Sequence, residues 1–152
     1  MIDAPLAGFL EEGLSIYVGT RDAGLRPNGA RGLAALVEDG GRHMVVHLAQ
    51  IAAARLLPDL ESNSQIAVSF GRPVDDRACQ VKGLFVETWP ASDRERAAIE
   101  AQWERFLRQL EQIGIPRPAT MGWVRWPAVG IRLKVTAVFE QTPGPGAGTP
   151  LA

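Results

Sequence analysis

The sequence predicts a mainly β (α+β) fold in which six mostly antiparallel strands close into a small barrel, with helices outside it. Segments of alternating apolar and polar residues are short and are separated by turn-forming residues, as in antiparallel sheets. The helical segments are too few to supply the crossovers of a doubly wound parallel sheet. Closing the sheet removes exposed strand edges. A chain of 152 residues fits one domain, since domains usually hold about 100–200 residues.

The first third of the chain predicts a short helix followed by an antiparallel meander of three strands. Alternating residues mark the strands, and Gly, Pro, Asp and Asn separate them. Asp39-Gly40-Gly41 is a strong hairpin turn between the second strand and the third. The expected ranges are a helix at 4–12 and strands at 14–20, 30–38 and 42–48.

The middle of the chain predicts a helix over 50–61 and two further strands. Pro58 lies well inside this helix. Because proline removes a hydrogen bond and clashes with the preceding turn, we expect a kink or a split there. Asn63 is expected to end the helix, and strands are expected at 66–70 and 77–89.

The helix over 92–113 has the clearest signals. Ser92 can cap its start, and Glu95, three residues later, completes a capping box. Gly114 is placed to end it. One stripe with a period of 3.6 residues is apolar. It consists of Ile99, Trp103, Phe106, Leu107, Leu110 and Ile113.

The chain ends with a strand and then a tail. Residues 131–139 alternate cleanly and predict the sixth strand, whereas residues 141–148 are rich in Pro and Gly and favour neither helix nor sheet. We therefore expect a barrel domain over 1–141 and a tail over 142–152. Either the tail lies against a partner subunit or a cofactor cleft, or it is a frayed terminus.

Composition excludes several classes of partner. A net charge of -1 and a pI near 6.1 give no reason to expect a nucleic acid or an anionic membrane. No apolar run approaches the roughly 20 residues that span a bilayer, and the N-terminus lacks the basic start of a signal peptide. The single Cys79 excludes an internal disulfide and a cysteine-rich zinc site. A cytoplasmic protein is the simplest interpretation.

Side chains that could catalyse a reaction on their own are scarce. His43 and His47 lie on one face of the third expected strand, roughly 13 Å apart, too far to bind one metal ion together. No metal site is therefore expected. Cys79 fits a small core residue better than a nucleophile, and no Walker loop, G-x-G-x-x-G or G-x-S-x-G motif follows a strand. Catalytic residues stay unassigned, and a cofactor would have to carry any chemistry.

Isolated cations are the remaining pattern. Arg31 lies in the second strand, Arg55 in the first turns of the following helix, and Lys82 in the fifth strand. Arginine forks and helix N-terminal amides both direct donors at a dianion, so these positions suit a phosphate monoester. Each cation could equally be solvated or paired with a carboxylate.

Several segments in this order resemble the pyridoxamine 5'-phosphate oxidase-like, FMN-binding split-barrel family, over about residues 9–141. The tail at 141–148 is similar to one carried by a bacterial subgroup. The segments are Leu14-Ser15-Ile16-Tyr17-Val18-Gly19-Thr20-Arg21, Pro27-Asn28-Gly29-Ala30-Arg31-Gly32, residues 51–63, Ile66-Ala67-Val68-Ser69-Phe70 and Gln80-Val81-Lys82-Gly83.

The resemblance implies a split β-barrel that forms a homodimer, with FMN in a cleft at the subunit interface. It places Arg31 and Arg55 near the flavin phosphate. It places His47 and Leu48 beside the ring and Gln80 on the strand that reaches the flavin, unless a two-residue shift puts Ala78 there. Together with Lys82 from the cation pattern, these are the expected cofactor-binding residues.

The chain also departs from the family. Classical oxidases have Ser-Arg-Lys at the helix start, where this chain has Ala-Arg-Leu over 54–56, and a strand-two lysine where it has Leu36. The resemblance therefore does not extend to vitamin B6 oxidation. Three hypotheses follow: a flavin-dependent oxidoreductase of undetermined substrate and electron donor, a cofactor-binding module without turnover, or a structural dimer. The module would hold haem, with His47 as its ligand, or the deazaflavin F420.

Overall fold

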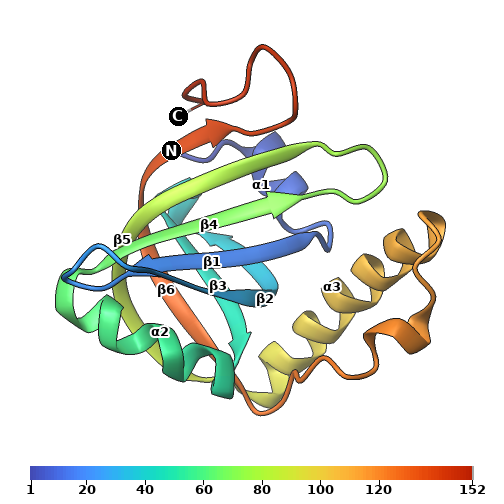
Figure 1. Cartoon of the computed structure of the whole chain (residues 1–152), viewed down its shortest axis with the longest axis horizontal. Helices are drawn as coiled ribbons and strands as arrows, with labels where there is room; N and C mark the ends of the chain where they lie inside the picture. The colour runs from blue at the N-terminus through green and yellow to red at the C-terminus, as the bar shows by residue number, and fades with distance from the viewer. Residues whose placement is uncertain (152) are drawn as a thin grey trace.

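The computed structural model describes residues 1–151 and confirms the expected barrel. Its strands close in the order β1–β2–β3–β6–β5–β4, and each neighbouring pair is antiparallel (Figure 1). The strands are β1 (Ser15–Arg21), β2 (Pro27–Glu38), β3 (His43–Ala49), β4 (Gln65–Gly71), β5 (Ala78–Pro90) and β6 (Ala128–Glu140). The helices are α1 (Ala4–Leu10), α2 (Gln50–Asn63) and α3 (Asp93–Gln112), with short 3-10 turns at Asp39–Gly41 and Arg117–Thr120.

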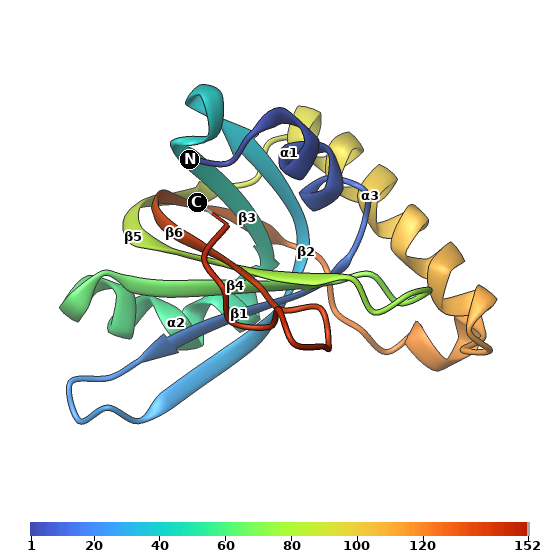
Figure 2. The ribbon, with the colours of Figure 1, turned by 90° about the horizontal axis from the view of Figure 1, so that it is seen from above.

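The helices cover the outside of the barrel in two groups. Figure 2 shows α1 and α3 together on one side, whereas α2 lies on the other. The barrel interior is filled by inward-facing aliphatic and aromatic side chains, and α3 buries a second, smaller cluster against β2. The inner core includes Ile16, Val18, Val46, Leu48, Val68, Phe70, Val81 and Leu133, and the α3 cluster includes Leu33, Ile99, Trp103, Phe106 and Leu110.

Helix α2 is not split at Pro58, so of the two expected outcomes, a kink or a split, the split does not occur. It continues to Asn63, and Ser64 caps it in a left-handed conformation. Pro58 cannot donate to the carbonyl of Ala54, but both residues are exposed. Water can therefore reach the carbonyl that the proline leaves free, and the helix tolerates the lost bond.

Helix α3 begins as the sequence predicts. The Ser92 side chain accepts from the Glu95 backbone N–H at 3.3 Å, and the Glu95 carboxylate accepts from the Ser92 N–H at 2.8 Å. The capping box is therefore present. In the apolar stripe Ile99, Trp103, Phe106 and Leu110 are buried and Leu107 is partly buried, but Ile113 is 47% exposed.

Strand β2 changes partners halfway along its length. It pairs with β1 up to Gly32, and a register shift follows in its pairing with β3. Beyond that point, side chains form hydrogen bonds with the edge of β2 that no longer pairs with β1. The Gln102 amide accepts from the Ala35 N–H at 3.0 Å and donates to the Ala35 carbonyl at 2.7 Å, and the Glu11 carboxylate accepts from the Val37 N–H at 2.7 Å.

The tail folds back on β6. Phe139 and Pro150 form an isolated antiparallel bridge. The Glu140 N–H donates to Thr149 O at 2.9 Å, and the Leu151 N–H donates to Val138 O at 2.7 Å. Residues 141–148 form neither helix nor strand, as expected, whereas residues 149–151, beyond that range, lie beside β6. Among residues 1–151, no helix is long and apolar enough to cross a bilayer.

Candidate functional site

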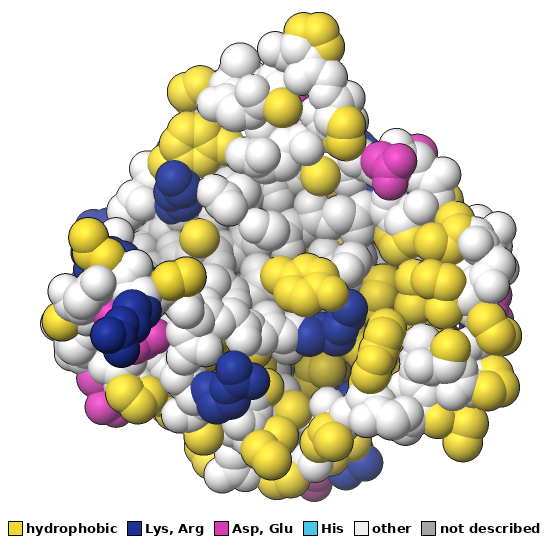
Figure 3. Space-filling view, in the orientation of Figure 1, with side chains coloured by type: hydrophobic (Ala, Val, Ile, Leu, Met, Phe, Trp, Pro, Cys, Tyr) yellow, Lys and Arg dark blue, Asp and Glu magenta, His cyan; other side chains and the backbone are white. Residues whose placement is uncertain are grey.

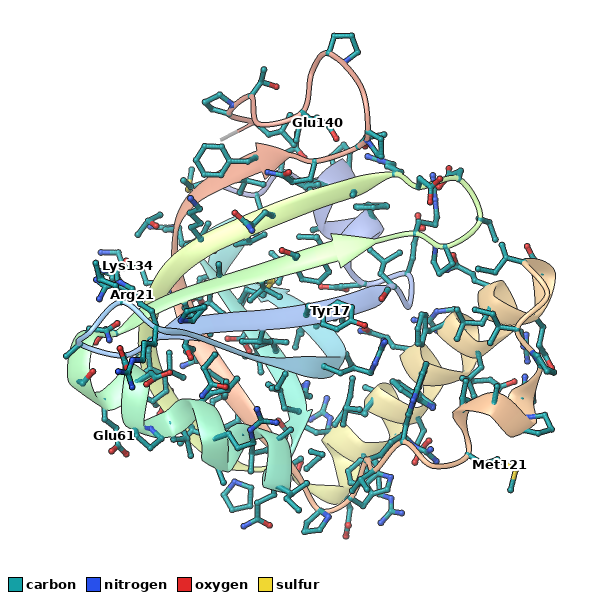
Figure 4. The ribbon with its side chains drawn as sticks, viewed as in Figure 1. Tyr17, Arg21, Glu61, Met121, Lys134 and Glu140 are labelled. Carbon is teal, nitrogen blue, oxygen red and sulfur yellow. The ribbon has the colours of Figure 1, made fainter. Side chains whose placement is uncertain are left out.

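The outer face of strands β2, β1, β4 and β5 carries a continuous row of polar side chains. Arg31 lies opposite Tyr17, Tyr17 opposite Ser69, and Ser69 opposite Gln80. Residues directly opposite one another share a face of the sheet, so these four side chains stand side by side on the outside of the barrel. The Gln80 amide donates to Ser69 Oγ at 3.1 Å. Figure 4 shows Tyr17 on the face of β1 seen in that view.

Two residues further along each strand lies a row of small residues. Gly29 lies opposite Gly19, Gly19 opposite Ala67, and Ala67 opposite Lys82. Three of the four positions thus carry almost no side chain, and the backbone itself forms a flat floor. Lys82 closes that floor at the β5 end.

A cleft of about 490 Å³ lies over these two rows. Helix α2 contributes Arg55 to it, and Asn28 ties the helix to β2 by donating to the Arg55 carbonyl at 2.6 Å. An adjoining hollow of about 380 Å³ is lined by Lys82 and Arg21 and shares the floor. The cleft is lined by Tyr17, Val18, Gly19, Gly29, Ala30, Arg31, Arg55, Ala67, Ser69 and Gln80. The structure therefore brings Arg31, Arg55 and Gln80 into one cleft.

The charge of this region is entirely positive. Arg31 and Arg55 lie at the β2 end, whereas Lys82 and Gln80 lie at the β5 end. Among residues 1–151, the side chains lining the two hollows include no carboxylate, histidine or thiol. The cleft can therefore attract an anion, but its own side chains offer no general base or nucleophile with a pKa near neutrality.

The floor glycines are not required by the packing of the barrel. A Cβ on Gly19 would lie 3.9 Å from its nearest neighbour, and one on Gly29 would lie 3.5 Å away, both ordinary contacts. At Gly32, by contrast, a Cβ would lie 2.5 Å from Ile16 Cγ2, so that glycine is needed for packing. A glycine inside a strand costs about 0.5–1 kcal/mol and often marks close approach of a ligand to the backbone. The floor fits a flat group lying against the sheet.

Arg31 stands within a cluster of aromatic rings. Its guanidinium carbon is 4.2 Å from the Trp123 ring centroid, 4.7 Å from that of Tyr17 and 5.7 Å from that of Phe106. Nη2 donates to the Tyr17 hydroxyl at 2.5 Å. Nη1 is buried and has no hydrogen-bond partner among the described residues. This arginine therefore retains an unused donor.

The structure places His47 and Leu48 outside the cleft. Leu48 points into the barrel and is fully buried. His47 is 5% exposed and lies with Glu95 and Trp89 beside a small cavity of about 90 Å³ near α3. Both faces of β3 are buried, one in the barrel and one under α3. Neither side chain lies where the resemblance placed it, beside a ring in the cleft, and the structure gives no support to His47 as a haem ligand.

His47 instead belongs to a buried hydrogen-bond network. Its Nε2 lies 3.1 Å from Glu95 Oε1, which also accepts from the Trp89 indole N–H at 2.9 Å. Burial lowers the pKa of His47 and outweighs the opposing effect of the carboxylate. Partial burial of the Glu95 carboxyl raises its pKa, but hydrogen bonds from Ser92, His47 and Trp89 outweigh this and lower it to about 2. We infer a neutral His47 that donates through Nε2 to an ionised Glu95.

Two further expectations concern metals and thiols. Cys79 is 2% exposed and packs in the inner core, as expected for a small core residue, and this burial raises the pKa of its thiol to about 12. Within the described chain, no cluster of three or more His, Cys, Asp or Glu side chains could hold a metal ion. Tyr17, Ser69 and the floor glycines were missed as site residues. The available signal was Gly19 inside the first expected strand, where glycine weakens the sheet; Gly29 lay just outside the second expected strand and gave no such signal.

Comparison with known proteins identifies the fold. No protein-family model and no curated protein matches the sequence. Among solved structures, HupZ of Group A Streptococcus is 19% identical with a TM-score of 0.57, covering 98% of this chain and 99% of that one. A candidate pyridoxamine 5'-phosphate oxidase of Lactobacillus delbrueckii is 15% identical with a TM-score of 0.53, covering 90% and 91%. An FMN-binding protein of Syntrophomonas wolfei is 10% identical with a TM-score of 0.53, covering 99% and 84%.

These similarities extend over nearly the whole length of each chain, and they agree with the strand order and with the helices outside the barrel. At such low identity they establish architecture and not activity. The chain has the pyridoxamine 5'-phosphate oxidase-like split-barrel fold.

Proposed function

We propose that this chain binds FMN in the cleft over the outer face of β2, β1, β4 and β5. The observation that carries the proposal is the flat floor of Gly19, Gly29 and Ala67, bordered by cations at one end and by Gln80 at the other. A phosphorylated planar cofactor needs both features: directed donors for a dianion and a surface without side chains for the ring.

Each cleft residue has a role under this proposal. Arg31 and Arg55 would hold the phosphate, since guanidinium groups form paired, charge-assisted hydrogen bonds to phosphate oxygens. Gln80 would donate to or accept from the polar edge of the ring, and Lys82 would add positive charge at the same end. His47 and Leu48 lie on β3 outside the cleft and would not contact the cofactor.

The reaction class follows from what the cleft lacks. Its side chains, within the described residues, include no carboxylate, histidine or thiol, so bound FMN would supply the electron or hydride transfer. The protein would orient the cofactor and exclude water. We therefore propose a flavin-dependent oxidoreductase. The same lack of catalytic side chains also favours the second candidate, a cofactor-binding module without turnover.

We further propose that the protein is a homodimer with the cleft at its interface. Tyr17, in the middle of the polar row, is 51% exposed, and Ile51 in the first turn of α2 is 71% exposed. Apolar side chains exposed beside a ligand cleft support a covering partner. A second copy of the chain would also shield a bound ring from water.

Titration of the purified apoprotein with FMN tests the proposal, with Arg55→Ala and Arg42→Ala as a matched pair. Arg55 lines the cleft, whereas Arg42 is exposed and donates to the Asp39 carbonyl at 3.2 Å. Loss of a charge-assisted hydrogen bond costs about 1.5–3 kcal/mol. Arg55→Ala should therefore raise the dissociation constant by roughly 10- to 150-fold, and Arg42→Ala should leave it unchanged.

Equal dissociation constants for the two variants would overturn the assignment of the phosphate. Parallel titrations with F420 and haem separate the cofactor classes, because each has its own visible spectrum. Tighter binding of F420 or haem than of FMN would favour the binding-module candidate. Binding of none of the three would leave a structural dimer.

A further inference from the structure

A second hollow lies on the other side of the polar row from the cofactor cleft. It measures about 570 Å³ and lies between α3, the segment after α3 and the turn joining β4 to β5. We call it the α3 groove. Figure 3 shows hydrophobic side chains gathered over α3 and the following segment, beside Lys and Arg side chains nearer the centre. It is lined by Ser15, Arg31, Gly71, Arg72, Pro73, Asp76, Ala78, Phe106, Leu110, Ile113, Ile115, Trp123, Gln141 and Pro143.

The walls of the α3 groove are mostly apolar. Phe106 and Leu110 are buried at its base, whereas Ile113 and Ile115 at its rim are 47% and 38% exposed. Its volume falls within the 300–1,000 Å³ typical of small-molecule sites. A groove of this size and character suits a small organic molecule with an apolar body.

Register explains why the groove is separate from the cleft. Ser15 lies opposite Gly71, and Gly71 lies opposite Ala78, so another row of small residues adjoins the polar row on its far side. The polar row, with Tyr17 at its middle, therefore forms a ridge between two hollows. Arg31 belongs to this ridge and lines both of them.

The charged groups of the groove differ in how well they are already paired. Arg72 binds Glu12 at 3.0 Å and Asp75 at 2.8 Å, so its charge is compensated. Asp76 is exposed in the turn between β4 and β5. Arg31 has no carboxylate partner among the described residues, and its Nη1 is buried without an acceptor. A buried donor without a partner costs about 1–3 kcal/mol.

The aromatic rings hold the Arg31 guanidinium at the groove. Trp123 and Phe106 line the groove but not the cleft, and the guanidinium carbon lies within 6 Å of both ring centroids. A guanidinium stacked on aromatic rings keeps its edge N–H groups available for a planar anion. A carboxylate is such an anion.

We propose that the α3 groove binds a small organic anion, an aromatic or aliphatic carboxylate whose charged group pairs with Arg31 and whose apolar body packs against Phe106, Leu110 and Trp123. This site lies outside the cofactor cleft and does not require a flavin. Arg31 lines both hollows, so if the cleft holds FMN, the carboxylate and the flavin phosphate would compete for its guanidinium.

Calorimetric titration of the purified protein with 4-phenylbutanoate and with 4-phenylbutan-1-ol tests the proposal. The two compounds share the apolar body and differ in charge. The carboxylate should bind about tenfold more tightly, because only it forms a charge-assisted hydrogen bond. Arg31→Leu should reduce that ratio to about one, and Arg31→Lys should retain part of it. Equal affinities in the unchanged protein, or a preference that survives Arg31→Leu, would overturn the proposal.

A second pair of variants locates the site. Ile113→Asp puts a carboxylate at the rim and should weaken 4-phenylbutanoate binding by about tenfold through repulsion and lost apolar contact. Val86→Asp is the control, because Val86 is 50% exposed on β5 and lines none of the hollows described above. Equal effects of the two substitutions would count against the groove. Circular dichroism checks that each variant folds. If Arg31→Leu does not fold, the proposal is tested by the ratio of acid to alcohol affinity in the unchanged protein and by the comparison of Ile113→Asp with Val86→Asp.

The main rival occupant is a second copy of the chain. If copies docked through the groove, 4-phenylbutanoate affinity would fall as protein concentration rises and dimers form. Affinity independent of protein concentration supports the proposal, whereas a loss in step with dimerisation overturns it. None of these measurements uses FMN, so a failed flavin titration would leave their outcome intact.

Discussion

Gly19 is the residue at which barrel stability and ligand binding have opposite requirements. It lies inside β1, where an added Cβ would be 3.9 Å from its nearest neighbour, an ordinary contact, and where the sheet favours a β-branched side chain. We expect Gly19→Val to leave the barrel folded and to stabilise it by about 0.5–1 kcal/mol. The isopropyl group would stand on the floor of the cleft, so the FMN dissociation constant should rise by more than about tenfold. Thermal unfolding and a flavin titration measure the two effects.

Gly71→Val serves as the control for that experiment. Gly71 is the last residue of β4, and a Cβ added to it would meet no other atom within 4 Å. It lines the α3 groove and not the cleft, so its substitution should leave FMN affinity unchanged. Equal losses of affinity in both variants would show that added bulk acts through the strand and not through the floor.

Site residues were predictable where their side chains stand on the outside of a strand or, for Arg55, of helix α2. Arg31, Arg55 and Gln80 were expected from sequence, and the structure brings them into one cleft, with Lys82 in the adjoining hollow. The structure puts His47 outside the cleft, which the sequence did not show, because alternation along a strand separates two faces without indicating what covers each. The packing of α3 on β3 buries that face, and it depends on contacts between residues 48 positions apart.

At the scale of elements, the link between His47 and Glu95 joins β3 to the start of α3. Because burial lowers the pKa of His47 below 6.5, the unfolded chain binds more protons than the folded chain just below that pH. Stability then rises with pH and is lost as pH falls. Glu95, with its pKa lowered to about 2, contributes in the same direction at lower pH. Both groups make the fold sensitive to acid.

We therefore expect the free energy of unfolding to decrease as pH falls from about 7, and His47→Gln to reduce that decrease. Urea unfolding at several pH values measures it. His43→Gln is the control, because His43 lies in the same strand and pairs with the exposed Asp39. If the free energy of unfolding of His47→Gln depends on pH as steeply as that of the unchanged protein, His47 is not the source of the acid sensitivity.

The tail is an element in its own right, since residues 149–151 extend the β6 edge. Truncation after Glu140 removes the backbone hydrogen bonds that join Thr149 and Leu151 to β6. Each is worth about 0.5–1.5 kcal/mol. We expect the midpoint of thermal unfolding to fall by several degrees. FMN affinity should not change, because the cleft lining contains no tail residue. Reduced flavin affinity at unchanged stability would place the tail on the cofactor after all.

Element boundaries show what local sequence can and cannot supply. The capping box of Ser92 and Glu95 places the start of α3 correctly, because capping depends on neighbours three residues apart. The outcomes at Pro58 and at Pro150 depend on exposure and on distant strands. These are properties of the assembled barrel, so local propensity could not show that α2 continues through Pro58 or that residues 149–151 pair with β6.

For the whole molecule, alternation and turns predicted six antiparallel strands, but not their order around the barrel. The pairings of β1 with β4 and of β3 with β6 join segments far apart in sequence. Register across those pairings aligns Arg31, Tyr17, Ser69 and Gln80. The polar row, the cofactor cleft and the α3 groove therefore form only when the barrel closes.

The proposed dimer is tested at the same scale. Light scattering should give about twice the chain mass of 16.4 kDa, because exposed apolar side chains such as Tyr17 and Ile51 favour a self-complementary contact. Tyr17→Asp should shift the equilibrium towards monomer. A monomer at micromolar concentration in the unchanged protein would remove the interface cleft from the proposed function.

The side chains that occupy the edge of β2 also bear on aggregation. Beyond Gly32 the strand has left β1, and a bare edge there would be a template on which another polypeptide could add a strand. Gln102 occupies both backbone groups of Ala35, and Glu11 occupies the Val37 N–H. Two polar side chains, one on α3 and one directly after α1, thus block the addition of another strand at this edge. Propensity to form amyloid-like assemblies should depend on these two residues more than on the hydrophobicity of the strand they protect.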